Sequence, residues 1–273
     1  MCFVSAETYK QRHDRSSLTA LIVAMFGMND PAQTLLQLER YVEDGRMEMS
    51  EVMATQFTEL FLAQKKRPAD AQIMLVKGLR ILCDVFLSRG KFKRAIASIK
   101  ILHRERKKLV RTLKTGAPQL LEKMTPASED YRRAGKIYAH AGKKGAAMKA
   151  FATCEKQSPG HVASAMEACQ LLGLEKKLVA RLVATVQAAG PVILYNEQFV
   201  FQPPNRPSVD AREVQTVMQS AVDSGVDSKD TCRNQISRIS EEIDAIERGE
   251  AAANARLQAA MDLLKPQHDY YKY

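Results

Sequence analysis

The chain has 273 residues, 45% of them apolar, and a net charge of +10. This length and apolar content supply one large or two small cores, which is not the composition of a disordered chain. No apolar run reaches the ~18–20 residues needed to cross a bilayer, which excludes a membrane span. With only 13 Gly and 10 Pro, the composition favours helices.

The longest apolar run, Leu18–Met28, is predicted to form a buried helix because Gly27 and Pro31 close it after about 11 residues. Gly27, Pro31, Ala32 and Leu36 are then typical of a turn followed by a further helix. We expect both pieces to belong to one helical domain.

The first residues bear on the compartment. Lys10, Arg12 and Arg15 are basic, but Glu7 and Asp14 lie among them, and mitochondrial presequences are usually poor in acid. No secretory signal is visible. We therefore expect an intracellular protein, with the cytoplasm favoured and the mitochondrion as the alternative.

A helical hairpin is predicted to turn at Gly90. Apolar residues recur at helical spacing on both sides of this glycine: Leu79, Leu82, Phe86, Phe92, Ala95, Ile99. No proline follows near residue 107, so the second helix is expected to run on.

That second helix is strongly basic. Residues 91–114 hold ten basic residues and one acid, Glu105, a net charge of +9. One side of the helix is predicted to be cationic: Lys100, Arg104, Lys107, Lys108, Arg111. The other side is apolar: Ile96, Ile99, Leu102, Leu109, Leu113. We interpret the cationic side as a contact for phosphate or an acidic protein, the alternative being an ordinary solvated face. Because no aromatic residue follows Phe92 in this stretch, reading of bases is not expected.

Residues 128–161 carry a repeated-helix pattern with small and aromatic residues at fixed places: Tyr131, Gly135, Tyr138, Ala147, Phe151, Pro159. Counted from residue 128, they fall at positions 4, 8, 11, 20, 24 and 32. This resembles the 34-residue tetratricopeptide repeat, and the hairpin around Gly90 resembles a degenerate copy that starts at residue 76. The resemblance implies an all-α solenoid of stacked helical hairpins, with Gly135 and Ala147 letting two helices approach closely. Another all-α fold is the alternative.

The resemblance also implies which side chains line a concave groove. The family's groove positions fall in this sequence on a cationic set: Lys77, Arg80, Arg132, Lys136, His140. Such grooves hold acidic or C-terminal peptides in the family, but the asparagines that usually complete a carboxylate clamp are missing. The alternative is that these side chains are solvated or covered by the chain's own tail.

The chain changes character after Gly190. Val192–Tyr195 and Phe199–Phe201 are β-prone and predict a small hairpin or an extended arm. Three prolines then make a stiff linker, and Asp210 with Glu213 predicts a capped helix near residues 211–224. The predicted domains are 1–190, a linker at 191–209 and a helical region at 210–273.

A heptad pattern marks residues 229–264, with an apolar seam on one side: Ile236, Ile239, Ile243, Ile246, Leu257, Leu264. So narrow a seam predicts one partner helix. That partner is the helix at 211–224, another subunit or a second copy of this chain.

No catalytic, metal-binding or cofactor-binding pattern stands out. The five cysteines are widely spaced, and Cys83, Cys154 and Cys169 fall on apolar helix faces, as buried thiols do. We therefore predict a non-catalytic interaction scaffold, one subunit of a larger assembly, without a cofactor. The alternative is a protein that binds RNA or a ribonucleoprotein, such as an organellar ribosome subunit, through the basic helix 91–114.

Overall fold

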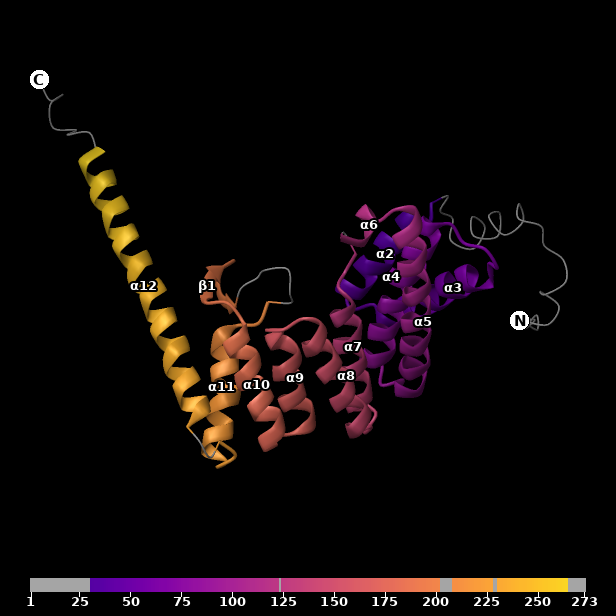
Figure 1. The fold of residues 1–273 in the computed structure, drawn as a ribbon. Helices are drawn as coiled ribbons and strands as arrows, with labels where there is room; N and C mark the ends of the chain where they lie inside the picture. Colours follow the sequence, from indigo (N-terminus) through magenta and orange to yellow (C-terminus); the bar gives the residue numbers. More distant parts are fainter. Residues whose placement is uncertain (1–29, 123, 202–207, 228–229, 265–273) are drawn as a thin grey trace, which may run out of the picture. The chain divides into compact units, whose positions relative to one another are not determined.

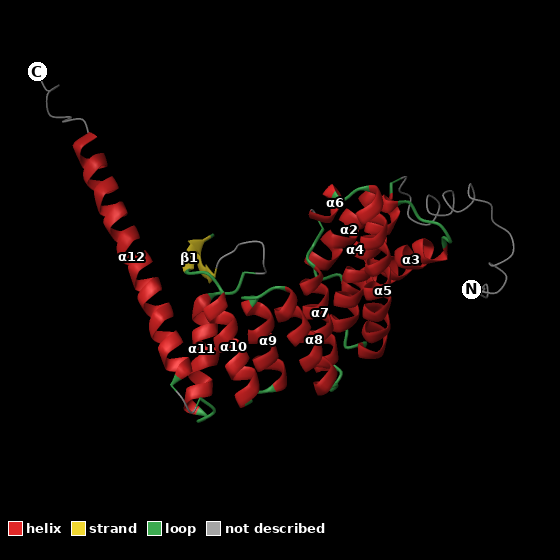
Figure 2. Ribbon diagram, viewed as in Figure 1, coloured by secondary structure: helices red, strands yellow, loops and turns green. Residues whose placement is uncertain are grey.

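The computed structural model describes residues 30–122, 124–201, 208–227 and 230–264. The fold is all-α: one two-stranded sheet accompanies the helices of the described residues, which confirms the predicted class (Figure 2). The chain forms two compact units, Met1–Gly142 and Lys143–Tyr273. Their boundary falls within the predicted repeat 128–161.

The first unit is built around one long central helix, α4, which contacts α2, α3, α5 and α7 (Figure 1). Its helices are α2 (Pro31–Glu43), α3 (Met47–Ala63), α4 (Ala69–Ser88), α5 (Phe92–Gly116), α6 (Gln119–Glu122) and α7 (Ala127–His140). Helices α3 and α4 approach closely at Gly78, where an added Cβ would lie 2.7 Å from the Phe57 ring. The site described below lies in this unit.

The hairpin of α4 and α5 confirms the turn predicted at Gly90. This residue has a φ of +68°, a conformation that glycine adopts without strain. The Lys91 amide donates to the Phe86 carbonyl at 2.8 Å, which closes the turn. Leu79 and Ile99 are both buried, as their spacing predicted.

The second unit contains a run of helices followed by a hairpin. Its elements are α8 (Lys144–Gln157), α9 (Val162–Leu172), α10 (Lys176–Ala188), β1 (Val192–Tyr195), β2 (Gln198–Phe201), α11 (Ala211–Asp223) and α12 (Thr231–Leu264). Asn196 and Glu197 both have positive φ, so a two-residue turn joins the antiparallel strands. The predicted hairpin is therefore present, and the Asp210 carboxylate caps α11 by accepting from the Arg212 amide at 2.9 Å.

The two helices expected from the repeat at 128–161 are present as α7 and α8. Gly135 is buried on α7 and Ala147 is buried on α8. Since α7 ends the first unit and α8 begins the second, the stacking of these helices as a repeat stays a prediction.

Helix α12 packs its first half within its own unit, against α10, α11 and β1. Ile239 and Ile243 of the predicted seam are buried, and Ile236 and Ile246 are half-buried. Leu257 and Leu264 lie on α12, but their side chains are outside the described residues. The described half of the seam therefore has a partner within the chain.

The thiols of Cys83, Cys154 and Cys169 are buried, as predicted. The predicted helix at Leu18–Met28 lies outside the described residues, as does most of the proline-containing linker.

Candidate functional site

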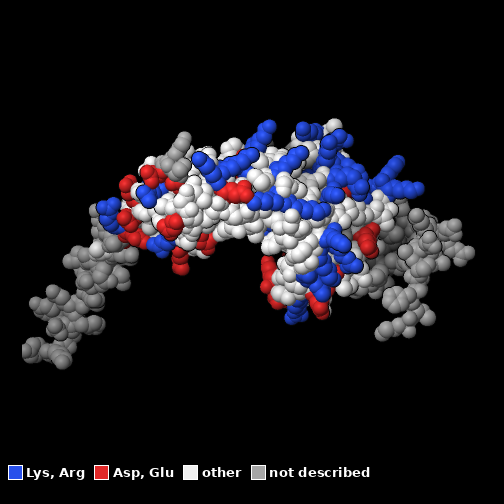
Figure 3. Space-filling view, turned by 90° about the horizontal axis from the view of Figure 1, so that it is seen from below, with Lys and Arg blue, Asp and Glu red and all other residues white. Residues whose placement is uncertain are grey.

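The outer face of α5 carries a row of basic side chains that runs the length of the helix. We call this the cationic row, and it consists of Lys93, Lys100, Arg104, Lys107, Arg111 and Lys114. All six residues are exposed, and successive members lie seven, four, three, four and three residues apart. At 1.5 Å per residue the row is about 31 Å long. Figure 3 shows how strongly Lys and Arg predominate on the face of the first unit that it draws.

The opposite face of α5 holds the row in place. Ile99, Leu102, Leu109 and Leu113 are completely buried, where α5 packs against α4 and α7. Because one face is fixed by apolar packing, the cationic face is held toward solvent. The predicted division of this helix into an apolar and a cationic side is confirmed.

The single acid of this helix, Glu105, is buried and ion-paired from several sides. Arg67 Nη2 lies 2.7 Å from Glu105 Oε2, and Lys108 Nζ lies 2.9 Å from Oε1. Burial by itself would raise the pKa of Glu105. Hydrogen bonds from Lys108 and Gln72 and the positive charge of Arg67 outweigh burial, so that the pKa is lowered.

These ion pairs separate the cations of α5 into two sets. Lys108 and Arg104 contact Glu105, at 2.9 and 3.2 Å. No acid of the described residues forms an ion pair with five members of the row: Lys93, Lys100, Lys107, Arg111, Lys114. Lys93 and Lys114 were not among the predicted face residues, although the seven-residue spacing of the four lysines is readable in the sequence.

The residues predicted to line a groove have different surroundings. Lys77 is exposed and lines two cavities, one of about 220 Å³ and one of about 350 Å³. Arg80 lines the smaller cavity, but its guanidinium is ion-paired with the buried Asp130, with Nε 2.7 Å from Oδ1. The guanidinium of Arg80 is therefore occupied by an internal ion pair, which differs from the ligand-binding role predicted for this residue.

The predicted groove residues of α7 are also engaged. Arg132 Nε lies 3.0 Å from Glu129 Oε2, and Lys136 is half-buried with further interactions. The exposed ring of His140 stacks on Phe92, with ring centroids 6.2 Å apart and planes 13° apart. The structure does not gather the five predicted groove residues into one open cationic groove.

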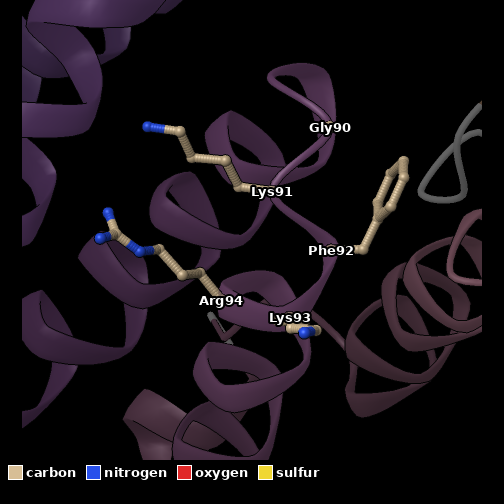
Figure 4. Close-up of a pocket in the computed structure, with 5 residues that line it drawn as sticks. All are labelled: Gly90, Lys91, Phe92, Lys93 and Arg94. Atoms are coloured by element: carbon tan, nitrogen blue, oxygen red, sulfur yellow. The ribbon is translucent and has the colours of Figure 1, made fainter.

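The turn before α5 and the first residues of this helix, Gly90–Arg94, line a cavity of about 530 Å³. Figure 4 shows Lys91 and Arg94 pointing to the side opposite Phe92. Both cations contact the buried carboxylate of Glu51, with Lys91 Nζ 2.6 Å from Oε1. The hydrogen bond from Lys91 lowers the pKa of Glu51. This cluster was not predicted, because Glu51 lies on a helix whose buried face carries polar residues.

Two other kinds of feature, a metal site and a membrane-spanning helix, are not found in the described ranges. They contain no group of three His, Cys, Asp or Glu side chains placed to hold a metal ion. None of their helices combines the length and apolarity that a membrane span requires.

Comparisons with known proteins find similarity in structure but none in sequence. No protein-family model matches the sequence, and no curated protein sequence matches it. A crystal structure of BtubC (BKLC) from P. vanneervenii is similar at a TM-score of 0.45 and 12% identity, covering 89% of this chain and 84% of that chain.

Proposed function

We propose that this protein is a non-catalytic interaction scaffold that docks an acidic partner protein on the cationic row of α5. One observation carries the proposal: five exposed cations of the row have no ion pair with any described acid. Like charges held this close repel one another, and an acidic partner relieves that repulsion.

The surroundings of the row support a protein partner. Residues 93–114 contain no Phe, Tyr or Trp and one acid, the buried Glu105, which leaves charge as the recognition chemistry of this face. Three buried carboxylates, those of Glu51, Glu105 and Asp130, fix nearby cations in place. The row therefore projects from a rigid helix, so that little backbone entropy is lost when a partner binds.

A tetratricopeptide-like architecture is part of the proposal. Two pairs of consecutive helices, α4 with α5 and α7 with α8, overlap the two segments that resemble the repeat, which supports this part of the proposal. Stacked hairpins of this kind present extended surfaces on which other proteins dock. In this proposal the chain is one subunit of a larger assembly.

Co-purification at endogenous level, read by mass spectrometry, tests the proposal. The test variant is Lys100→Glu/Lys107→Glu/Arg111→Glu, and the matched control is Lys65→Glu/Lys66→Glu, which changes two exposed lysines that are not members of the row. We expect partners with acidic surfaces to be lost from the first variant and retained by the second. Migration of the native protein alone at 30.5 kDa under gentle, low-salt conditions would contradict the proposal.

A further inference from the structure

The spacing of the cations along the row favours a ligand whose negative charges recur at the same interval. From Lys93 to Lys114 the members recur every 3.5 residues on average, with one vacancy at Ala97. This corresponds to an axial spacing of about 5.3 Å, sustained over about 31 Å. A ligand that meets every cation at once must present its negative charges on one face at the same interval.

An extended acidic chain does not keep this interval. Same-face side chains of a strand lie about 6.6–6.8 Å apart, so over the length of the row they drift by more than one full position. Lysine stems absorb a local mismatch, but they do not absorb one that accumulates along the row.

A nucleic acid duplex is a poorer match still. Its phosphates rise about 3.4 Å per nucleotide along each strand and wind around the duplex axis. A straight row therefore meets only a few of them. Single strands are usually held by stacking of bases on aromatic side chains, and the row contains none.

We propose that the cationic row binds an α-helix whose own acidic residues recur three and four residues apart on one face. This inference rests on the proposed function and names the form of its acidic partner. Two helices with the same repeat stay in register along the whole contact. The exposed Ala97, between Lys93 and Lys100, leaves room for a partner backbone at the start of the row.

Four lysines of the row recur every seven residues, and this repeat predicts the crossing angle of a partner helix: Lys93, Lys100, Lys107, Lys114. Positions seven residues apart drift by about 20° around a straight helix, so the lysines wind slowly across the face of α5. A partner helix that follows them crosses α5 at about +20°, the angle of left-handed helix pairs.

Two synthetic peptides with one composition and a net charge of about −6 separate spacing from charge. In the first, six glutamates recur three and four residues apart. In the second, the same glutamates are distributed around the helix, and circular dichroism confirms equal helicity. Binding of each to the full chain is measured at about 50 mM salt, together with a single-stranded oligouridine.

We expect the first peptide to bind about tenfold more tightly than the second. Each glutamate that meets a cation of the row raises the affinity a little, and several such pairs form at once. Lys100→Glu/Lys107→Glu should remove that preference, and Lys65→Glu/Lys66→Glu should leave it unchanged. Equal binding of both peptides would overturn the inference and leave the proposed function intact, since charge alone would then suffice. Tighter binding of oligouridine would overturn both, as would a failure of both peptides to bind.

Discussion

The Nε atom of Arg80 lies 2.7 Å from Oδ1 of Asp130, a carboxylate that is completely buried. Arg106 Nη1 approaches the other oxygen of the same carboxylate at 2.9 Å. Because Arg80 lies on α4, Arg106 on α5 and Asp130 on α7, one buried acid joins three helices of the first unit.

Replacement of this acid is expected to be costly. Asp130→Asn leaves two largely buried guanidinium groups without a counter-charge, which should lower the free energy of unfolding by about 3–5 kcal/mol. Urea unfolding monitored by circular dichroism measures the change. Asp84→Asn is the control, since Asp84 is 44% exposed where it pairs with Arg133, and we expect it to cost about 1 kcal/mol or less. Equal losses for the two variants would show that burial of Asp130 does not matter.

Glu105 should make the stability of the first unit depend on acid. Its pKa in the folded chain is lowered from the usual 4.5, so the unfolded chain binds more protons as pH falls. The stabilisation is therefore complete above about pH 5 and is lost as pH falls toward the lowered pKa.

We expect Glu105→Gln to weaken the dependence of the urea midpoint on pH between about pH 5 and pH 3. The same variant should be less stable than the native protein at neutral pH, because Arg67 then lacks its buried partner. An unchanged acid dependence in the variant would assign the effect to Glu51, whose pKa is lowered in the same direction.

Gly78 tests the close approach of α3 and α4. An added Cβ meets the buried Phe57 ring at 2.7 Å, so Gly78→Ala should destabilise the protein by about 1–3 kcal/mol although alanine favours helices. Gly249→Ala, on α12 with open space around the glycine, should instead stabilise its helix by about 0.5–1 kcal/mol. Differential scanning calorimetry compares them, and stabilisation by both would contradict the tight contact.

The sequence predicted the helices of the hairpin around Gly90 because apolar residues recur there at helical spacing and a glycine marks the turn. It did not predict α3, because polar residues, Ser50, Glu51 and Thr58, interrupt the apolar residues on the buried face of that helix. Residue spacing reveals an amphipathic helix only where the buried residues are apolar and the exposed residues are polar.

The candidate site also has a part that the sequence predicts and a part that it does not. The row on α5 was predictable because all its members lie on one helix, whose local spacing fixes which residues share a face. The role of Arg80 was not, because its partner Asp130 lies fifty residues away and meets it only through packing of α4 against α7. The groove positions of the family predict where on a helix a residue lies. The tertiary fold determines which groups its side chain contacts.

The seam of α12 provides a test of packing within the chain. Ile239 is completely buried and Ile236 is half-buried, so Ile239→Ala should cost about 2–4 kcal/mol and Ile236→Ala clearly less. Thermal unfolding of both variants at two protein concentrations measures the costs. A melting temperature that rises with concentration would show instead that the seam pairs with a second copy.

The most direct test of the cationic row is lysine acetylation footprinting of the purified endogenous complex against the isolated protein. We predict that acetylation of Lys93, Lys100, Lys107 and Lys114 slows several-fold in the complex, while Lys65 and Lys66 react at the same rate in both. Equal rates for the row lysines in complex and isolated protein would contradict the claim that α5 is the docking surface.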